Sequence, residues 1–179
     1  AARPRFVNHF IEEARAAGRL NHPNIIQVHD VDSENGVHYF SMEFVEGSTC
    51  TQLLHARGPF GPAEALEITR LTAKALQYAH ENRIIHRDVK PDNIMVGINN
   101  LVKLADLGIS RTFDEAAAEN SVKRIVGTPQ YMAPEVARGQ RIDHRVDIYS
   151  LGATLHQLLT GQQLFPDITG SDLLKAHVK

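Results

Sequence analysis

Apolar residues recur at helical spacing in several stretches of the chain. Between residues 4 and 19 they fall three or four positions apart, which predicts an amphipathic helix. A second helix is predicted to begin at Gly61-Pro62 and to end at Asn82, because proline suits the first helical turn. A third is expected after Asp143, which would cap it, and to end at Gly161. The residues expected on its buried side are Ile148, Leu151, Leu155, Leu158 and Leu159.

Short apolar runs predict strands between these helices. Residues 25–28 and 37–42 flank Asn35-Gly36, which is typical of the turn in an antiparallel hairpin. Residues 93–96 and 101–105 form two further runs, with a turn expected over residues 97–100. A last helix is predicted to begin near Asp172.

Composition limits the class of protein. The chain has 179 residues, 42% of them apolar, enough for the core of one domain. Lys and Arg number 19 against 21 Asp and Glu, so the charge gives no reason to expect nucleic acid as a partner. The single Cys50 cannot form an internal disulfide, which fits a reducing cytoplasm. No apolar run reaches about 18 residues, so no membrane contact is expected from this segment, and a membrane anchor in other segments of the full-length protein stays open.

A highly polar loop follows the apolar pair Ile84-Ile85. Its sequence from His86 to Asn93 matches the pattern H-R-D-x-x-x-x-N, in which the Asp accepts the proton of an attacking hydroxyl. Asp88 would be that base, and Asn93 would hold a magnesium ion, which prefers oxygen ligands. Taken alone, the segment is equally consistent with a solvated turn between two strands.

Two more motifs follow in order: Asp106-Leu107-Gly108, then the run from Gly127 to Glu135 that ends in Ala-Pro-Glu. With all three, the chain resembles a eukaryotic-type protein serine/threonine kinase, of the kind also found in bacteria. The resemblance covers the chain from Phe6 onward. It departs from the usual pattern at Leu107, where the family commonly has Phe, a change expected to alter packing more than metal binding.

The resemblance implies an α+β fold with two lobes. Residues 1–45 are expected to be the remnant of the N-terminal lobe with the hinge, and residues 46–179 most of a helical C-terminal lobe. The glycine-rich phosphate loop and the strand lysine of the family would lie before Ala1, and the last helices after Lys179. The chain is therefore expected to be one partial kinase domain, and the isolated fragment to transfer phosphate poorly.

The resemblance also implies ATP and Mg²⁺ as cofactors, with Mn²⁺ as an alternative ion, and Ser or Thr hydroxyls of proteins as acceptors. Asp88 would be the catalytic base, and Lys90 would neutralise charge on the transferring phosphoryl group. Asn93 and Asp106 would be the metal ligands. Thr128 would position the base and the lysine.

Five positions are implied for the nucleotide pocket. Glu13 would pair with the missing strand lysine. Met42 would be the gatekeeper residue, and the backbone of Glu43 and Val45 would meet the edge of the adenine. Met95 would lie beneath the adenine ring.

The polar stretch from residue 110 to residue 126 is implied to be the activation loop. Such a long loop in a compact domain is generally functional. Arg87, beside the base, would bind a phosphate added there. Ser121 is the preferred phosphorylation site by position, and Thr112 is second.

Three residues are implied to have structural roles. His86 is expected to be a packed imidazole rather than a catalyst. Glu135 is expected to lock the C-terminal lobe by pairing with an arginine beyond the end of this chain, and to be buried without a partner here. Asp147 is expected to hold the backbone of the H-R-D loop.

Other functions stay open at this point. A catalytically impaired fragment or a pseudokinase-like interaction module would differ by the residue at the upstream lysine position. A small-molecule phosphotransferase could share the polar loop, although Lys90 and the run to Glu135 argue against it. Self-association for autophosphorylation is a further candidate interaction.

Overall fold

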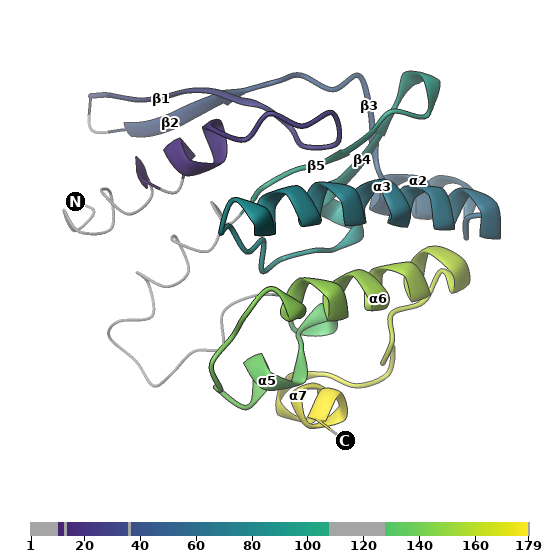
Figure 1. Cartoon of the computed structure of the whole chain (residues 1–179). Helices are drawn as coiled ribbons and strands as arrows, with labels where there is room; N and C mark the ends of the chain where they lie inside the picture. The colour runs from purple at the N-terminus through teal and green to yellow at the C-terminus, as the bar shows by residue number, and fades with distance from the viewer. Residues whose placement is uncertain (1–10, 13, 36, 108–127, 179) are drawn as a thin grey trace.

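The structure is a computed structural model, and it describes residues 11–178 apart from 13, 36 and 108–127. The predictions for Glu13, Thr112 and Ser121 lie outside the described residues. Figure 1 shows a hairpin above a second sheet, with the helices below them.

The hairpin consists of β1 (Val28–Glu34) and β2 (Val37–Met42), paired antiparallel. The helical residues 11–12 and 14–18 lie against it (Figure 1), with Ala14 and Ala17 buried. The hairpin is confirmed, but its first strand begins later than residue 25. Ile25 instead forms a parallel bridge with Leu104, because this segment crosses to the second sheet.

The second sheet has the order β3 (Gly47–Thr49), β4 (Ile94–Gly97), β5 (Val102–Leu104). Both pairings are antiparallel, and the short helix η2 (Ile98–Asn100) provides the expected turn between β4 and β5. A Cβ atom at Gly47 would lie 2.3 Å from the carbonyl oxygen of Val96. Only glycine therefore allows β3 to approach β4 this closely.

Helix α2 (Cys50–Arg57) follows β3 directly and was not predicted from the apolar pattern, since only Cys50 and Leu54 are buried on it. Its start is encoded by a capping box, in which Thr49 and Gln52 exchange side-chain to backbone hydrogen bonds. Helix α3 (Pro62–Glu81) begins with proline and has Asn82 as its C-cap, as predicted.

Helix α6 (Arg145–Thr160) ends at Gly161, whose φ of 73° is left-handed, as predicted. At its start the cap is His144 rather than Asp143, although the Asp143 carboxylate accepts the N–H of Arg145 at 2.9 Å. The predicted buried side is wrong at Ile148, which is 59% exposed, and at Leu159, which is 38% exposed. The inward face instead includes polar residues, namely Asp147, Ser150 and Thr154.

The remaining elements are short or lie near the C-terminal end. They are η1 (Pro91–Asn93), η3 (Pro129–Tyr131), α5 (Pro134–Ala137) and α7 (Gly170–Val178), the last in the place predicted for the final helix.

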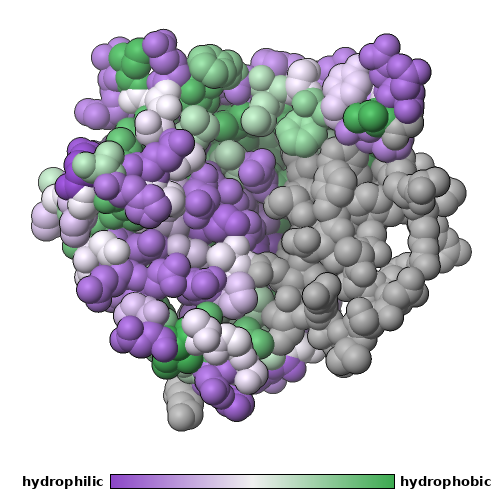
Figure 2. Space-filling view, turned by 180° about the vertical axis from the view of Figure 1, so that it is seen from behind, coloured by the Kyte–Doolittle hydropathy of each residue, from purple (hydrophilic) through white to green (hydrophobic). Residues whose placement is uncertain are grey.

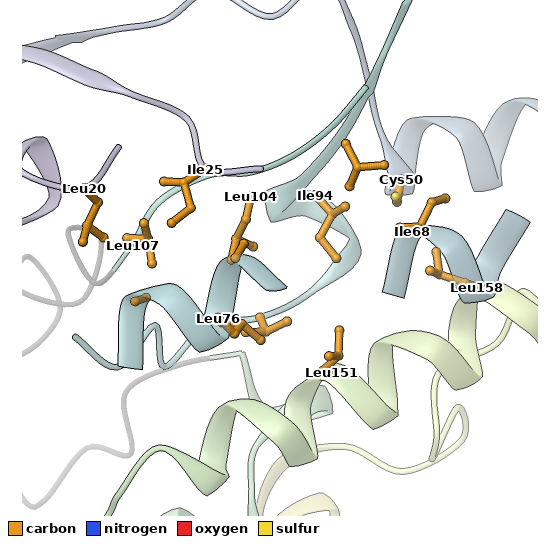
Figure 3. Packing of buried hydrophobic residues seen from close by; sticks show 14 of the residues in the cluster. Leu20, Ile25, Cys50, Ile68, Leu76, Ile94, Leu104, Leu107, Leu151 and Leu158 are labelled. Atoms are coloured by element: carbon orange, nitrogen blue, oxygen red, sulfur yellow. The ribbon is translucent and has the colours of Figure 1, made fainter. Parts of the chain in front are cut away.

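One hydrophobic core connects the two sheets with the helices. Figure 3 shows Leu104 and Ile94 of the second sheet above Leu76 of α3, with Leu151 of α6 below and Leu158 of α6 beside Ile68 of α3. Seen from behind, the described surface is mostly hydrophilic over the helical part (Figure 2). No helix in the described ranges is long and apolar enough to cross a membrane.

Candidate active site

Asp88, Lys90 and Thr128 form a triangle of polar contacts. The Nζ of Lys90 lies 2.7 Å from Oδ2 of Asp88 and 2.8 Å from Oγ1 of Thr128. The Thr128 hydroxyl donates to Oδ1 of Asp88 at 3.0 Å. The polar loop is thus joined to the residue before η3, which lies 40 positions further along the chain.

Asn93 links this triangle to the segment that carries Asp106. Its Nδ2 donates to the carbonyl of Asp88 at 2.8 Å and to Oδ2 of Asp88 at 3.1 Å. Its own carbonyl accepts the N–H of Ala105 at 2.8 Å. Because Ala105 directly precedes Asp106, the segments with Asp88, Asn93 and Asp106 meet in one place.

His86 reinforces the same junction from inside the core. It is fully buried, its Nε2 lies 2.9 Å from the carbonyl oxygen of Ala105, and its Nδ1 accepts the N–H of Asp88 at 3.2 Å. Both contacts are satisfied by a neutral imidazole with its proton on Nε2. The ring therefore ties the polar loop to the strand end before Asp106.

Asp147 holds the backbone of the polar loop from helix α6. It is fully buried, and its two oxygens accept the N–H groups of His86 at 2.9 Å and Arg87 at 2.7 Å. Burial alone would raise the pKa of Asp147, but the hydrogen bond from His80 at 2.7 Å, together with the other donors, holds it below its ordinary value. The carboxylate therefore stays charged at neutral pH.

Asp88 is also an ionised carboxylate. Burial would raise the pKa of Asp88, but the hydrogen bond and charge of Lys90 and the hydrogen bond of Thr128 outweigh it and lower the pKa. A carboxylate with a low pKa accepts hydrogen bonds well but takes a full proton only from a strong acid. This suits a group that orients a hydroxyl and receives its proton late in a reaction.

Asp106 adopts a left-handed backbone with φ of 57°, a region that Asp tolerates better than most residues. The next residue, Leu107, is 5% exposed and belongs to the core. Its burial leaves Asp106 at the edge of the core, next to a small pocket. This pocket is lined by Ala17, Ile26, Val28, Phe40, Met42, Asp106 and Leu107.

The segment after β2 lies beside this pocket. The N–H of Glu43 donates to the carbonyl of Gln27 at 2.8 Å, so this N–H is not available to a ligand. Val45 is buried and forms a second apolar cluster with Ile26, Ala105 and the partly buried Met95. Val45 and Met95 are therefore brought together, while Met42 lines the neighbouring pocket and is 47% exposed.

Arg87 also has a left-handed backbone, with φ of 66°. Its Nε is buried and has no hydrogen-bond partner among the described residues. Glu135, expected to be buried, is instead partly exposed on α5, a helix with no fully buried residue. The expected cost of a buried unpaired carboxylate therefore does not apply.

Several polar residues of the site were not identified from the sequence. Ser150 and Gln157 of α6 bond to Tyr131, and His80 of α3 bonds to Asp147. Lys103 of β5 pairs with Glu43 at 2.7 Å. The only sequence signal was polar residues on the predominantly apolar face of α6, at helical spacing from Asp147.

Comparisons with known proteins agree on the family. A family model described as "Protein kinase domain" matches residues 2–179. Serine/threonine-protein kinase PknB of Mycobacterium leprae is 40% identical over 180 residues, covering 98% of this chain and 29% of that protein. Serine/threonine-protein kinase PrkC of Bacillus subtilis is 36% identical over 174 residues, covering 97% of this chain and 27% of that protein.

Among solved structures, the crystal structure of Rad53 1-466 in complex with AMP-PNP has a TM-score of 0.76 and 31% identity. The match covers 95% of this chain and 42% of that one. The chain thus spans less than a third of the length of the two curated relatives named above. Over the matched residues, the chain belongs to the protein kinase domain family.

Proposed function

We propose that the chain is the larger part of an ATP-dependent protein serine/threonine kinase domain. The observation that carries the proposal is the junction of Asp88, Asn93 and the strand end before Asp106, with Lys90 and Thr128 both bonded to Asp88. PknB and PrkC are both named serine/threonine-protein kinases, which supports the choice of serine and threonine as acceptors.

The residues fit Mg²⁺ by the chemistry of their donor atoms. The amide NH₂ of Asn93 is turned toward Asp88, and no hydrogen bond within the described ranges uses its Oδ1. Oδ1 of Asn93 and the carboxylate of Asp106 would hold the ion together with the phosphates of ATP. When bound, the ion neutralises charge on the phosphates. For the adenine, we assign the carbonyl of Glu43, the backbone of Val45, and the side chains of Met42 and Met95.

Asp88 accepts a hydrogen bond from the acceptor hydroxyl and orients its oxygen toward the γ-phosphorus of ATP. As the new oxygen to phosphorus bond forms, the bond to the β-phosphate oxygen breaks and ADP leaves. The hydroxyl proton passes to Asp88. Lys90 stabilises the transferring phosphoryl group, and Thr128 holds both side chains in register.

We assign Arg87 a regulatory role. Its buried Nε lacks a partner within the described ranges, and a phosphate is the acceptor that a guanidinium binds best. The candidate phosphorylation sites are Ser121 and, second, Thr112. Glu13 would pair with the strand lysine of the intact protein. These assignments predict that phosphorylation of the loop increases activity.

The proposal extends to the organisation of the chain. Residues 1–45 belong to the N-terminal lobe and hinge, and residues 46–179 to the C-terminal lobe. Protein substrates with Ser or Thr acceptors are the partners, self-association serves autophosphorylation, and the domain works in the cytoplasm.

The test uses the intact protein that contains this chain, incubated with Mg-ATP and a generic basic protein. We expect phosphate incorporation, and Asp88→Asn should reduce it by about a thousandfold or more because the hydroxyl is no longer oriented. Asp32→Asn, an exposed carboxylate on β1, is the matched control and should leave incorporation unchanged. Equal incorporation by Asp88→Asn would reject Asp88 as the base.

If the intact protein incorporates no phosphate at all, the enzyme proposal fails. Nucleotide binding without transfer would then favour an interaction module. The sequence of the intact protein also distinguishes an enzyme from an interaction module, by the residue at the upstream lysine position.

A further inference from the structure

Helix α6 carries a polar row on its inward face, formed by Asp147, Ser150, Thr154 and Gln157. The first three are 5% exposed or less. These residues recur every three or four positions and so share one side of the helix. Buried polar side chains are costly unless their hydrogen bonds are satisfied, so the partners of this row show what it does.

Both the backbone carbonyl and the phenol of Tyr131 are bonded to this row. The hydroxyl of Ser150 donates to the carbonyl oxygen of Tyr131 at 2.7 Å, and the phenol of Tyr131 donates to Oε1 of Gln157. Tyr131 itself is 6% exposed. Burial, outweighing the bond to Gln157, raises the pKa of Tyr131, so the phenol remains a donor at neutral pH.

Tyr131 is rigidly connected to Thr128. The two residues are the end of η3 and its N-cap, and the N–H of Tyr131 donates to the carbonyl of Thr128 at 3.1 Å. Pro129 between them fixes its own φ angle. Anchoring Tyr131 on α6 therefore fixes the backbone of Thr128 within a single helical turn.

Helix α6 also anchors the polar loop that carries Asp88. Asp147 holds the N–H of Arg87, directly before the base. Residues 147 and 150 are about 4.5 Å apart along a helix axis. Asp88 and Thr128 thus bond to each other, while the backbones of Arg87 and Tyr131 beside them are held by neighbouring positions of one helix.

We propose that Ser150 is a positioning residue for phosphoryl transfer. By holding the carbonyl of Tyr131, it keeps the Thr128 hydroxyl on Asp88 and Lys90, and Gln157 supports it through the phenol. This inference rests on the proposed function. A purely local role is the alternative, because Ser150 also lies 3.0 Å from the carbonyl of Val146 one turn back.

The test compares Ser150→Ala with Thr72→Val in the intact protein. Thr72 on α3 is a matched control: it is fully buried, and its hydroxyl donates to the carbonyl of Ile68 one turn back at 2.8 Å. No bond of Thr72 to another segment occurs within the described ranges. We expect Ser150→Ala to lower kcat about tenfold to a hundredfold with KM for ATP unchanged, since misplacement affects the transition state. Thr72→Val should keep the kcat of the wild type.

A double-mutant cycle with Thr128→Ala separates positioning from a local effect. If Ser150 acts through Thr128, then Thr128→Ala should lower kcat clearly less in the Ser150→Ala background than alone. Tyr131→Phe, which removes only the bond to Gln157, should lower kcat in the same direction with less change in folding. If Ser150→Ala does not fold, the kcat of Tyr131→Phe tests the inference in its place.

Wild-type kcat in Ser150→Ala and Tyr131→Phe, or fully additive effects with Thr128→Ala, would overturn the inference. Asp88→Asn in the same assay separates the test of the kinase function from the test of the role of Ser150. If Asp88→Asn is inactive while Ser150→Ala is unaffected, the kinase function stands and the role of Ser150 fails. If the wild-type protein transfers no phosphate, both fail.

Discussion

Asp88 keeps its charge because of its immediate neighbours. Burial opposes ionisation, while Lys90 and Thr128 favour it and lower the pKa of Asp88. A carboxyl group with a lowered pKa stabilises the folded state above its unfolded pKa, and this stabilisation is lost as pH falls through the folded value. The contribution of Asp88 is therefore complete at neutral pH and disappears only in acid.

Lys90→Met tests this balance. The substitution removes the attractive charge but leaves the burial, so the pKa of Asp88 should rise, which a ¹³C NMR titration of the carboxyl group would detect. The variant should also lose stability at a higher pH than the wild type during acidification. Lys175→Met, which removes an exposed partner of Asp172, should leave the Asp88 titration unchanged. An unchanged titration in Lys90→Met would mean that other groups set the charge of Asp88.

At the scale of the element, α6 has an inward face that mixes apolar and polar residues. Leu158 is fully buried in the core, whereas its neighbour Leu159 is 38% exposed. Leu158→Ala should lower the free energy of unfolding by about 2–5 kcal/mol through lost burial and a cavity. Leu159→Ala should change it by about 1 kcal/mol or less, because the side chain keeps much of its contact with water.

Urea unfolding followed by circular dichroism measures both variants. The two substitutions remove the same atoms from adjacent positions of one helix, so helix propensity cancels in the comparison. Equal losses of stability would mean that α6 is rotated relative to its described packing.

At the scale of the whole molecule, the hairpin is joined to the second sheet by backbone and charge. The N–H of Ile26 donates to the carbonyl of Leu104 at 2.9 Å, and Lys103 pairs with Glu43 at 2.7 Å. Lys103 is 8% exposed. Burial would raise the pKa of Glu43, but the hydrogen bond from Lys103, followed by that from the N–H of Gln27, lowers it.

Glu43→Ala leaves the Lys103 ammonium buried without its counter-charge. We expect a loss of about 1–2 kcal/mol in the free energy of unfolding, moderated because solvent reaches Glu43. The pH dependence should also change: the contribution of Glu43 is present at neutral pH and is lost as pH falls through its lowered pKa, so the wild-type advantage should vanish in acid.

Thermal unfolding at several pH values measures this difference. Glu67→Ala is the control, because Glu67 pairs with Arg70 at 2.6 Å on the exposed face of α3 and should contribute nothing measurable. A Glu43→Ala variant as stable as Glu67→Ala would show that the backbone bonds alone join the hairpin to the second sheet.

The sequence was informative where short-range chemistry decides structure. Asn35-Gly36 marked the hairpin, Gly61-Pro62 the start of α3, and Gly161 the end of α6, because turns and helix ends depend on residues a few positions apart. The family and the α+β fold recognised from three motifs are confirmed by the comparisons. The roles of the individual site residues stay proposals.

Which side of α6 is buried depends on the segments that pack against the helix. Periodicity placed Ile148 and Leu159 inside, since a stripe of apolar residues usually faces the core. The helix is instead turned so that Asp147 and Ser150 reach the polar loop and η3. The hydrogen bonds gained there are not visible in the apolar pattern.

The sequence by itself determined the order of the motifs, the helix ends and the hairpin turn, because each of these is encoded by neighbouring residues. Only the tertiary structure decided that the Thr128 hydroxyl bonds to Asp88, that Asp147 holds the N–H of Arg87, and that Ser150 holds the carbonyl of Tyr131. These contacts join positions far apart along the chain or on different elements. Their geometry depends on how the whole core packs, and no local pattern specifies it.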